Sequence, residues 1–333
     1  MHLNSKILED FRDKNVLIIG DVMLDRYLFG KISRISPEAP VPILDLEHDQ
    51  SRLGGAANVA LNIKALDANP LLLSVIGNDR RGKELLDLFP AVSLNNQFLI
   101  QSAHRPTTVK SRILAANQQI LRIDEESKED LNEEESEALT GKIRQIFNNF
   151  KIDIILFQDY NKGVLTDRII REVIMESLRM DIPVAVDPKF DNFWTYKKCT
   201  LFKPNLDEVR KSVPFGVKPN LASLDAASEY IRAQLGNQIL MVTLSENGVY
   251  LDDGHESCIY PTTPRTISDV CGAGDSVIAI SSLCLSANVS SAQMGRLANL
   301  CGGQVCEKVG VVSIDKKQLS QEIDKMHAEK PVN

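Results

Sequence analysis

The sequence predicts an α/β protein with a mostly parallel central sheet. Apolar runs such as residues 16–21 and 71–76 have the length and continuity of strands buried on both faces. They alternate with longer segments of helical character such as residues 167–180 and 221–235, a rhythm typical of βα units. No internal repeat or linker-like stretch is present, so we predict one domain over residues 1–333.

The first part of the chain sets this pattern. Residues 4–13 are predicted to form a short amphipathic helix before the first strand, 16–21. The small residues 54–58 (Gly-Gly-Ala-Ala-Asn) open a helix, because Val59, Ile63 and Leu66 follow at helical spacing. A strand at 71–76, a helix at 80–89 and a strand at 96–101 come next.

From residue 139 the alternation continues to the end of the chain. Helices are predicted at 139–149, 167–180 and 221–235, and strands at 152–157, 183–187, 200–202, 239–244, 249–251 and 258–260. Two long helices then follow the glycine-rich stretch 268–276, the first of them beginning with the apolar run 277–285.

Two segments interrupt the alternation. Residues 28–47 carry three prolines among β-branched residues, which suits edge strands and turns. Residues 107–124 contain two strand-like runs around a hairpin at 115–117. We predict that both segments form a small β flap, or lid, beside the main sheet. Strand alternation puts Lys110 and Arg112 on one face of the flap, where they are either solvated or meet an anionic substrate.

The stretch 268–276 (Ser-Asp-Val-Cys-Gly-Ala-Gly-Asp-Ser) is the predicted chemical centre. Small residues before a helix leave backbone N–H groups bare, where the helix dipole favours an anion such as phosphate. Asp275 would repel a phosphate unless it faces an attacking hydroxyl. In phosphoryl transfer the amides bind the transferred group, and a carboxylate orients and deprotonates the nucleophile. The alternative is an ordinary glycine-rich turn with Asp275 as an N-terminal helix acid.

Polar residues follow several predicted strands. Asp21 ends the first strand with Asp25 close behind, and the later strand ends carry residues 158–163, 187–189 and 203–208, rich in Asp, Asn and Lys. Ligands collect at the carboxyl ends of strands in open α/β sheets. The sequence therefore predicts a polar substrate site at this edge.

Composition excludes several classes of protein. The net charge of −7 resides in residues 124–137, whose nine acidic residues and one lysine leave the remainder near neutral, which argues against nucleic-acid binding. The six cysteines contain no CxxC pair, and no histidine lies at zinc-like spacing. With no signal-like or membrane-spanning segment in the sequence, we expect a cytoplasmic protein without membrane contacts.

Three motifs in order resemble the ribokinase-like (PfkB) sugar kinases. Residues 54–58 are similar to their N-terminal signature, 205–208 to their N-x-x-E motif and 269–275 to their D-T-x-G-A-G-D signature. The resemblance covers about residues 10–325 and implies a ribokinase-like three-layer α/β/α sandwich with a lid. It also implies ATP as phosphoryl donor and Mg²⁺, and allows a monovalent cation.

Within this family, residues 20–27, 33–42 and 117–119 are similar to the heptose 7-phosphate kinases. The resemblance implies phosphorylation of the anomeric hydroxyl of D-glycero-D-manno-heptose 7-phosphate to the 1,7-bisphosphate, a step toward ADP-heptose and lipopolysaccharide core. It further implies a homodimer through the lid strands. Many relatives carry a fused adenylyltransferase with an H-x-G-H motif; the motif is absent here, so a separate protein is expected to transfer the nucleotide.

The resemblance also implies roles for individual residues. Asp275 is the expected catalytic base, with an anion hole from the amides of Gly272, Ala273 and Gly274. The residues expected around the sugar are Asp21, Asp25, Gly54, Gly55 and Asn58, with Lys110, Arg112 and Arg34 for its phosphate. The residues expected around ATP are Lys189, Asn205, Glu208, Thr243, Ser245, Gly248 and Asn299, of which Asn205 and Glu208 also arrange Mg²⁺ through water.

Two positions depart from the family pattern, and other functions stay open. Cys271 and Ser276 stand where the family usually has threonine. The alternatives are a kinase of another sugar or sugar phosphate and a non-catalytic sugar-binding regulator, although the retained Asp275 argues against the regulator. A dehydrogenase is disfavoured because no G-x-G-x-x-G follows the first strand.

Overall fold

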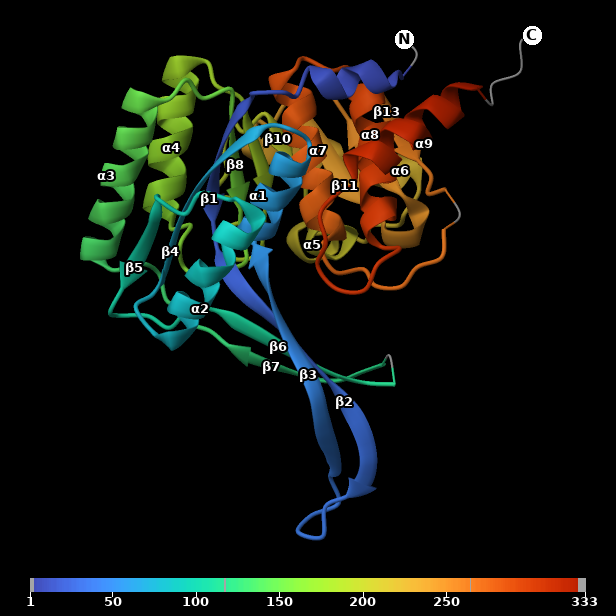
Figure 1. Ribbon diagram of the computed structural model, residues 1–333. Coiled ribbons are helices and arrows are strands. Elements are labelled where there is room, and N and C mark those ends of the chain that lie inside the picture. The colour runs from blue at the N-terminus through green and yellow to red at the C-terminus, as the bar shows by residue number, and fades with distance from the viewer. Residues whose placement is uncertain (1–2, 117, 264, 329–333) are drawn as a thin grey trace.

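The computed structural model describes residues 3–116, 118–263 and 265–328. Its main sheet has nine strands in the order β13-β12-β11-β10-β9-β8-β1-β4-β5. This sheet runs through the upper part of the view in Figure 1. All neighbours pair in parallel except β11 with β12 and β12 with β13. The strands are β1 (Asn15–Gly20), β4 (Asn69–Gly77), β5 (Leu99–Ser102), β8 (Ile154–Gln158), β9 (Val184–Asp187), β10 (Leu201–Phe202), β11 (Ile239–Thr243), β12 (Val249–Asp252) and β13 (Ser257–Tyr260).

Helices cover both faces of this sheet, and each face has its own hydrophobic core. One core joins the sheet to α1 (Ala56–Ala65), α2 (Arg80–Leu88), α7 (Ala273–Ser286), α8 (Ser291–Val305) and α9 (Lys316–Ala328). The other joins it to α3 (Glu133–Asn149), α4 (Asp167–Met180), α5 (Leu206–Ser212) and α6 (Leu221–Leu235). The predicted three-layer α/β/α sandwich is thereby confirmed.

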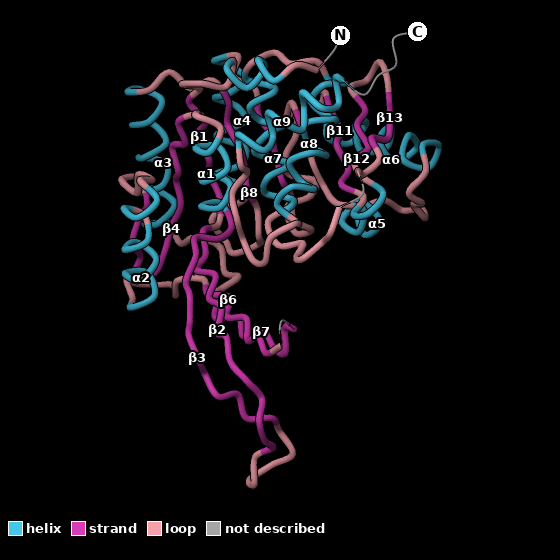
Figure 2. The backbone as a smooth tube through the Cα atoms, turned by 45° about the vertical axis from the view of Figure 1, so that its right-hand side comes forward, coloured by secondary structure: helices cyan, strands magenta, loops and turns pink. Residues whose placement is uncertain are grey.

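The predicted lid is a separate four-stranded sheet in the order β3-β2-β6-β7, which projects away from the body (Figure 2). It contains β2 (Val22–Ile35), β3 (Pro42–Gly55), β6 (Val109–Ala115) and β7 (Gln118–Glu125). β2 starts earlier than predicted, because the β2–β3 ladder runs back to Val22 opposite Gly55. Pro42 is the first residue of the edge strand β3. A proline is tolerated there because it has no N–H to donate to a neighbouring strand. The tip of the predicted hairpin at Asn117 lies outside the described residues.

Three predicted elements differ in extent. The expected helix at 4–13 is only a five-residue 3₁₀ turn, η1 (Ser5–Glu9). The strand expected at 96–101 begins at Leu99, because Asn95 Oδ1 accepts a hydrogen bond from Gln97 N and forms a turn there. α3 begins at Glu133 rather than residue 139, because Asn132 and Glu135 form a capping box over its acidic first turn.

Helix α9, which follows the two predicted C-terminal helices, was not predicted from the sequence. It packs Leu319 and Ile323 into the core beside α7 and α8. Short 3₁₀ turns at Pro90–Val92 and Ser245–Asn247 complete the described secondary structure. Across the described part of the chain, none of the helices has both the length and the apolar character needed to cross a bilayer.

Candidate active site

The glycine-rich stretch forms the start of α7, as predicted. Gly272 is the N-cap residue in a left-handed conformation with φ +81°, which glycine adopts without strain. A Cβ at this position would lie 3.0 Å from Asn58 Nδ2, so a larger residue would also crowd the neighbouring side chain. The Ala273 N–H donates a 3.3 Å hydrogen bond to Val270 O. This N–H was predicted to be unbonded and available to an anion, but it already has a partner.

Asp275 lies in the first turn of α7, and only 5% of its surface is exposed. Its Oδ2 accepts a 2.6 Å hydrogen bond from Asn58 Nδ2, and its Oδ1 accepts hydrogen bonds from Tyr160 Oη at 2.6 Å and Gln158 Nε2 at 3.3 Å. Burial raises the pKa of Asp275 to about 6, although the Tyr160 and Asn58 hydrogen bonds oppose the rise. A carboxylate with such a pKa is a suitable general base near neutral pH.

A buried ion pair stands beside this turn. Lys203 Nζ lies 3.1 Å from Asp187 Oδ1, and Gln158 Nε2 donates to Asp187 Oδ2 at 3.2 Å. A Cβ added to Gly274 would lie 3.7 Å from Lys203 Nζ. These residues end or follow β8, β9 and β10, so the carboxyl ends of three neighbouring strands bring a cation to the predicted anion hole.

Asn58, which was predicted to contact the sugar, contacts Asp275 in the structure. Asn58 is fully buried in α1, and its side-chain amide is committed to Asp275. Asn62, one turn later, donates to Asn58 O at 2.8 Å and to Asn58 Oδ1 at 3.4 Å. In this structure Asn58 therefore orients the Asp275 carboxylate.

Asp21 also has a structural function in place of the predicted sugar contact. Its carboxylate is 1% exposed and accepts backbone hydrogen bonds from Tyr160 at 2.8 Å, Lys162 at 3.2 Å and Val164 at 3.2 Å. Burial and the nearby Asp159 carboxylate raise the pKa of Asp21 to about 6, against these three hydrogen bonds. Asp21 thus anchors the loop that carries Tyr160 to Asp275.

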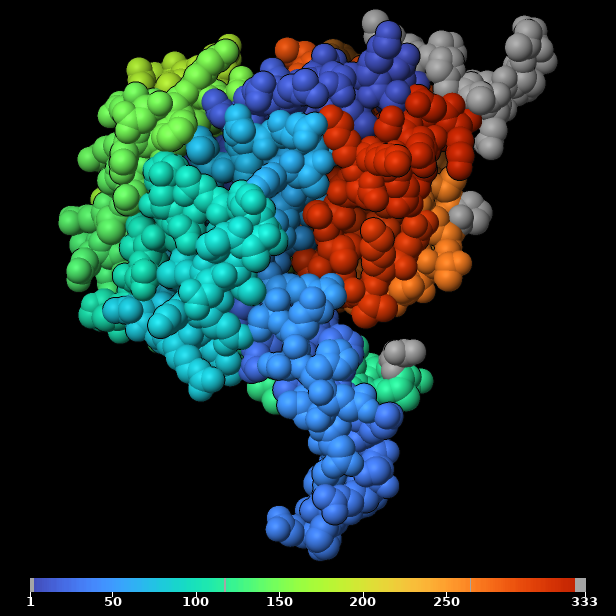
Figure 3. All heavy atoms as spheres, viewed as in Figure 1, coloured from blue at the N-terminus to red at the C-terminus, as the bar shows by residue number. Residues whose placement is uncertain are grey.

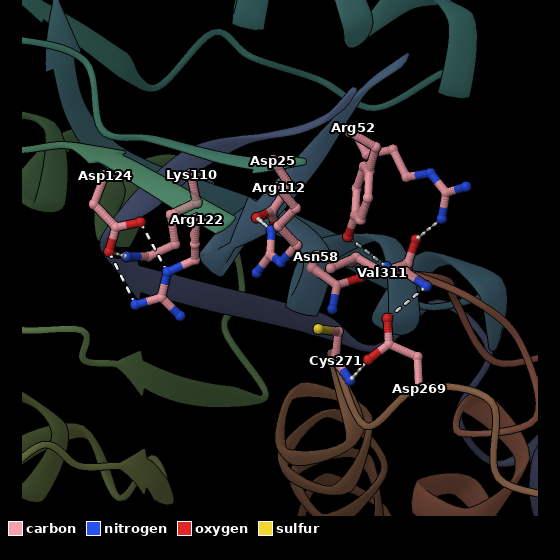
Figure 4. Close-up of polar contacts among 12 residues, drawn as sticks. Asp25, Arg52, Asn58, Lys110, Arg112, Arg122, Asp124, Asp269, Cys271 and Val311 are labelled. Atoms are coloured by element: carbon pink, nitrogen blue, oxygen red, sulfur yellow. Dashed lines mark hydrogen bonds and ion pairs between the residues drawn. The ribbon is translucent and has the colours of Figure 1, made fainter. Parts of the chain in front are cut away.

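Asp25 lies at the root of the lid, on the face that looks toward the turn (Figure 4). It forms an ion pair with Arg112 of β6, and the two strands pair in parallel here. Burial raises the pKa of Asp25, although Arg112 opposes the rise. A Cβ on Gly54 would lie 2.1 Å from Asp25 Oδ2, so this glycine makes room for the carboxylate. Gly55 has φ +60° and turns the chain from β3 into α1.

The lid brings together two of the three predicted phosphate-binding cations. Lys110 and Arg112 project from the same face of β6, and Lys110 Nζ pairs with Asp124 at 3.0 Å and Glu126 at 3.1 Å. Arg122 on β7 also pairs with Asp124, at 2.9 Å, and lies directly opposite Arg112. The sequence reading did not single out Arg122, although its place across the hairpin from Arg112 follows from strand alternation.

Arg34 does not belong to this group, contrary to the prediction. It lies on β2 nine residues beyond Asp25, which is about 30 Å at the usual rise per residue of a strand. It is exposed and paired with Ile43 of β3 in the outer part of the lid. Because β2 continues without a break to Ile35, Arg34 lies far along the strand from Asp25.

On the expected nucleotide side, Asn205 and Glu208 form a capping box at the start of α5. Asn205 Oδ1 accepts from Glu208 N at 2.8 Å, and Glu208 Oε2 accepts from Asn205 N at 2.8 Å. The other carboxylate oxygen, Oε1, accepts from Lys189 Nζ at 2.6 Å. Both oxygens therefore have protein partners, an arrangement that fits Mg²⁺ held through water better than direct ligation. In the described ranges, no group of three or more His, Cys, Asp or Glu residues is placed to bind a metal ion directly.

The remaining predicted nucleotide residues lie toward β13. Thr243 ends β11, and Ser245 and Gly248 form the turn into β12, where a Cβ on Gly248 would lie 2.0 Å from Tyr260 O. Asn299 Nδ2 donates to Pro261 O at 2.6 Å and lines a cavity of about 520 Å³ together with Tyr260 and Thr262.

These features, a buried carboxylate at a glycine-flanked helix start and polar side chains at the strand ends, are those expected of an α/β phosphotransferase. The chain belongs to the pfkB family of carbohydrate kinases, because the model of that family matches residues 13–318. It is similar to the bifunctional protein HldE of Geobacter metallireducens, with 38% identity over 320 residues that cover 96% of this chain and 64% of that protein. The chain thus spans slightly less than two thirds of that relative's length.

Solved structures show the same fold. Phosphofructokinase-2 from Escherichia coli, in complex with potassium, has a TM-score of 0.77 and 18% identity, and the match covers 94% of this chain and 99% of that one. A ribokinase from Arabidopsis thaliana, complexed with ribose and ATP, has a TM-score of 0.72 and 16% identity, with coverage of 94% and 99%. At these identities, the likeness supports the fold alone.

Proposed function

We propose that the protein transfers the γ-phosphoryl group of ATP to the anomeric hydroxyl of D-glycero-D-manno-heptose 7-phosphate. The observation that carries this proposal is the environment of Asp275, a buried carboxylate with a raised pKa beside a glycine-flanked helix N-terminus and the Lys203 cation. The choice of a heptose phosphate rests on the similarity of residues 20–27 and 33–42 to heptose 7-phosphate kinases, and the inward-facing lid cations support it.

In the proposed reaction, Asp275 takes the proton from the anomeric hydroxyl of the sugar. The oxygen of this hydroxyl attacks the γ-phosphorus of ATP, and ADP leaves. Tyr160 and Asn58 hold the carboxylate in place, while the Gly272 and Gly274 amides and Lys203 stabilise negative charge on the transferred group. Bound Mg²⁺ would supply further neutralisation of the phosphates, with Asn205 and Glu208 reaching it through water. The lid excludes water, which otherwise competes for the phosphoryl group.

A substrate panel with the Asp275→Asn variant tests this function. We expect kcat/KM for the heptose 7-phosphate to exceed that for ribose, fructose 6-phosphate or free heptose by roughly a hundredfold, and kcat of Asp275→Asn to fall by about 10² or more with little change in ATP binding. A preference for another sugar would leave a pfkB carbohydrate kinase of different specificity. Sugar binding without ADP release would instead favour a non-catalytic regulator.

We also propose a cytoplasmic homodimer that pairs through the outer face of the lid. Leu121 and Ile123 of β7 are 56% and 49% exposed, and Ile113 of β6, opposite Leu121, lies on the same outward face. An exposed apolar strand face is a common association surface. Light scattering should give a dimer mass for the wild type and a monomer mass for Leu121→Glu; a monomeric wild type would rule out the proposal.

A further inference from the structure

Two lid side chains hold segment 309–311 of the body beside the glycine-rich turn, residues 268–276, that starts α7. Tyr27 of β2 accepts a 3.0 Å hydrogen bond on its hydroxyl from Val311 N. Arg52 of β3 donates from Nη1 to Val309 O at 3.1 Å and to Val311 O at 3.0 Å. The segment 309–311 connects α8 to α9, so these bonds join the lid to the C-terminal helices (Figure 4).

The same segment continues to the anion hole through Asp269. Gly310 N donates to Asp269 Oδ2 at 2.9 Å, and the other oxygen of this carboxylate accepts from Cys271 N at 3.0 Å. Burial acts to raise the pKa of Asp269, but hydrogen bonds from the Cys271 thiol and from the Cys271 and Gly310 N–H groups outweigh it and lower this pKa. Cys271 is covalently next to Gly272, the N-cap of α7, and its position decides where the amides of the turn point.

Close packing makes this contact specific. Gly310 has φ +74°, and a Cβ there would lie 2.7 Å from Arg52 Nη1 and 3.0 Å from Tyr27 Cζ. The Tyr27 ring lies between two guanidinium groups, with Arg52 Cζ at 5.0 Å and Arg112 Cζ at 5.4 Å from its centroid. Arg112 in turn pairs with Asp25 at the expected sugar position.

We propose that Tyr27 and Arg52 are positioning residues that couple the lid to the phosphoryl-binding turn through Val311, Gly310, Asp269 and Cys271. When the lid is seated, Arg52 and Tyr27 fix segment 309–311, and Asp269 then holds the turn with its amides directed at the transferred group. None of these side chains touches the reacting atoms. The inference rests on the proposed function only in taking the Asp275 turn as the phosphoryl site.

The coupling predicts a loss in kcat rather than in binding. Tyr27→Phe removes the acceptor for Val311 N. Arg52→Lys keeps the charge, but the lysine side chain is one atom shorter than the path to Arg52 Nη1, so its ammonium group does not reach both carbonyls. We expect each variant to lower kcat about tenfold while KM for ATP changes less than about threefold. Hydrogen exchange of the Gly310 and Cys271 amides should accelerate in both variants, which a general loss of stability elsewhere in the lid would not produce.

A double-mutant cycle separates coupling from independent damage. If Tyr27 acts through Asp269, the Tyr27→Phe/Asp269→Asn double variant should be no more than about twofold slower than the slower single variant. Lys31→Ala, on the exposed outer part of β2, is the matched lid control and should leave kcat unchanged. If the double variant does not fold, Tyr27→Phe and Arg52→Lys still decide the question.

The inference is overturned if the two effects multiply, or if Tyr27→Phe and Arg52→Lys are folded and keep kcat within about twofold of the wild type. Neither result bears on the proposed reaction. That reaction fails independently, if Asp275→Asn retains turnover.

Discussion

Tyr160 Oη donates a 2.6 Å hydrogen bond to Asp275 Oδ1, and this contact joins the loop after β8 to the start of α7. Burial, reinforced by the nearby carboxylates, raises the pKa of Tyr160 well above its ordinary value, so its hydroxyl remains a donor at any working pH. Asp275 is buried as well, and the Tyr160 bond is the largest influence that stabilises its charged form. The two residues therefore set together the pH at which the Asp275 carboxylate ionises.

The first prediction follows from this pair. Tyr160→Phe removes the hydrogen bond that lowers the pKa of Asp275, so this pKa should rise above its present value of about 6. Because the base must be ionised to act, the acid limb of the kcat profile should move to higher pH, and the variant should lose more activity at pH 6 than at pH 8. An equal loss at both pH values would mean that Tyr160 acts on something other than the ionisation of Asp275.

The second prediction concerns stability. The folded-state pKa of Asp275 is raised from 3.8 to about 6, so between these values the folded protein binds more protons than the unfolded chain. Its contribution to the free energy of unfolding therefore decreases as pH rises through this window, by about 3 kcal/mol at most. Asp275→Asn is neutral throughout, so its stability relative to the wild type should increase from pH 4 to pH 8.

Urea unfolding at both pH values measures this difference. Other carboxylates titrate in the two proteins alike and cancel in the comparison. A stability difference that is the same at pH 4 and pH 8 would contradict the raised pKa. If the prediction holds, burying the ionised Asp275 carboxylate lowers the stability of the folded protein at neutral pH.

The sequence predicted most of the fold because strand runs and helix periods are local signals. The bounds of α4 and α6 match the predicted segments, and even the lid was recognised from its prolines. The site was less predictable, because a residue type does not reveal its partner. Asn58 and Asp21 are polar residues in the expected places, yet their hydrogen bonds go to Asp275 and to a loop backbone. The position of Lys203 beside Asp187 and Gly274 could not be predicted, because it depends on which strands are neighbours in the sheet.

The third prediction concerns magnesium. Glu208→Gln keeps a side-chain acceptor for the Asn205 N–H but removes the charge beside Lys189. If Glu208 arranges Mg²⁺ through water, the variant should need a higher Mg²⁺ concentration for half-maximal rate and show a lower kcat. Glu135→Gln is the matched control, because Asn132 and Glu135 form the same capping box at the start of α3. If both variants give the same magnesium titration, Glu208 only caps α5 and does not arrange Mg²⁺.

The last prediction concerns the sugar phosphate and rests on the proposed substrate. Lys110 and Arg122 lie on the inward face of the lid and share the Asp124 carboxylate, so a bound phosphate would exchange with Asp124 for the same two cations. Charge-assisted hydrogen bonds contribute roughly 1.5 to 3 kcal/mol each. Lys110→Ala and Arg122→Ala should therefore each raise KM for the heptose 7-phosphate about tenfold or more and leave KM for free heptose unchanged.

Two further variants make this assignment strict. Asp124→Asn removes the competing carboxylate and should lower KM for the phosphorylated sugar, an effect of opposite sign that general damage to the lid cannot mimic. Arg34→Ala, in the outer part of the lid, should leave both KM values unchanged. If Arg34→Ala weakens binding of the phosphorylated sugar while Arg122→Ala does not, the phosphate lies farther out along β2, and the lid must bend toward the body to bring it there.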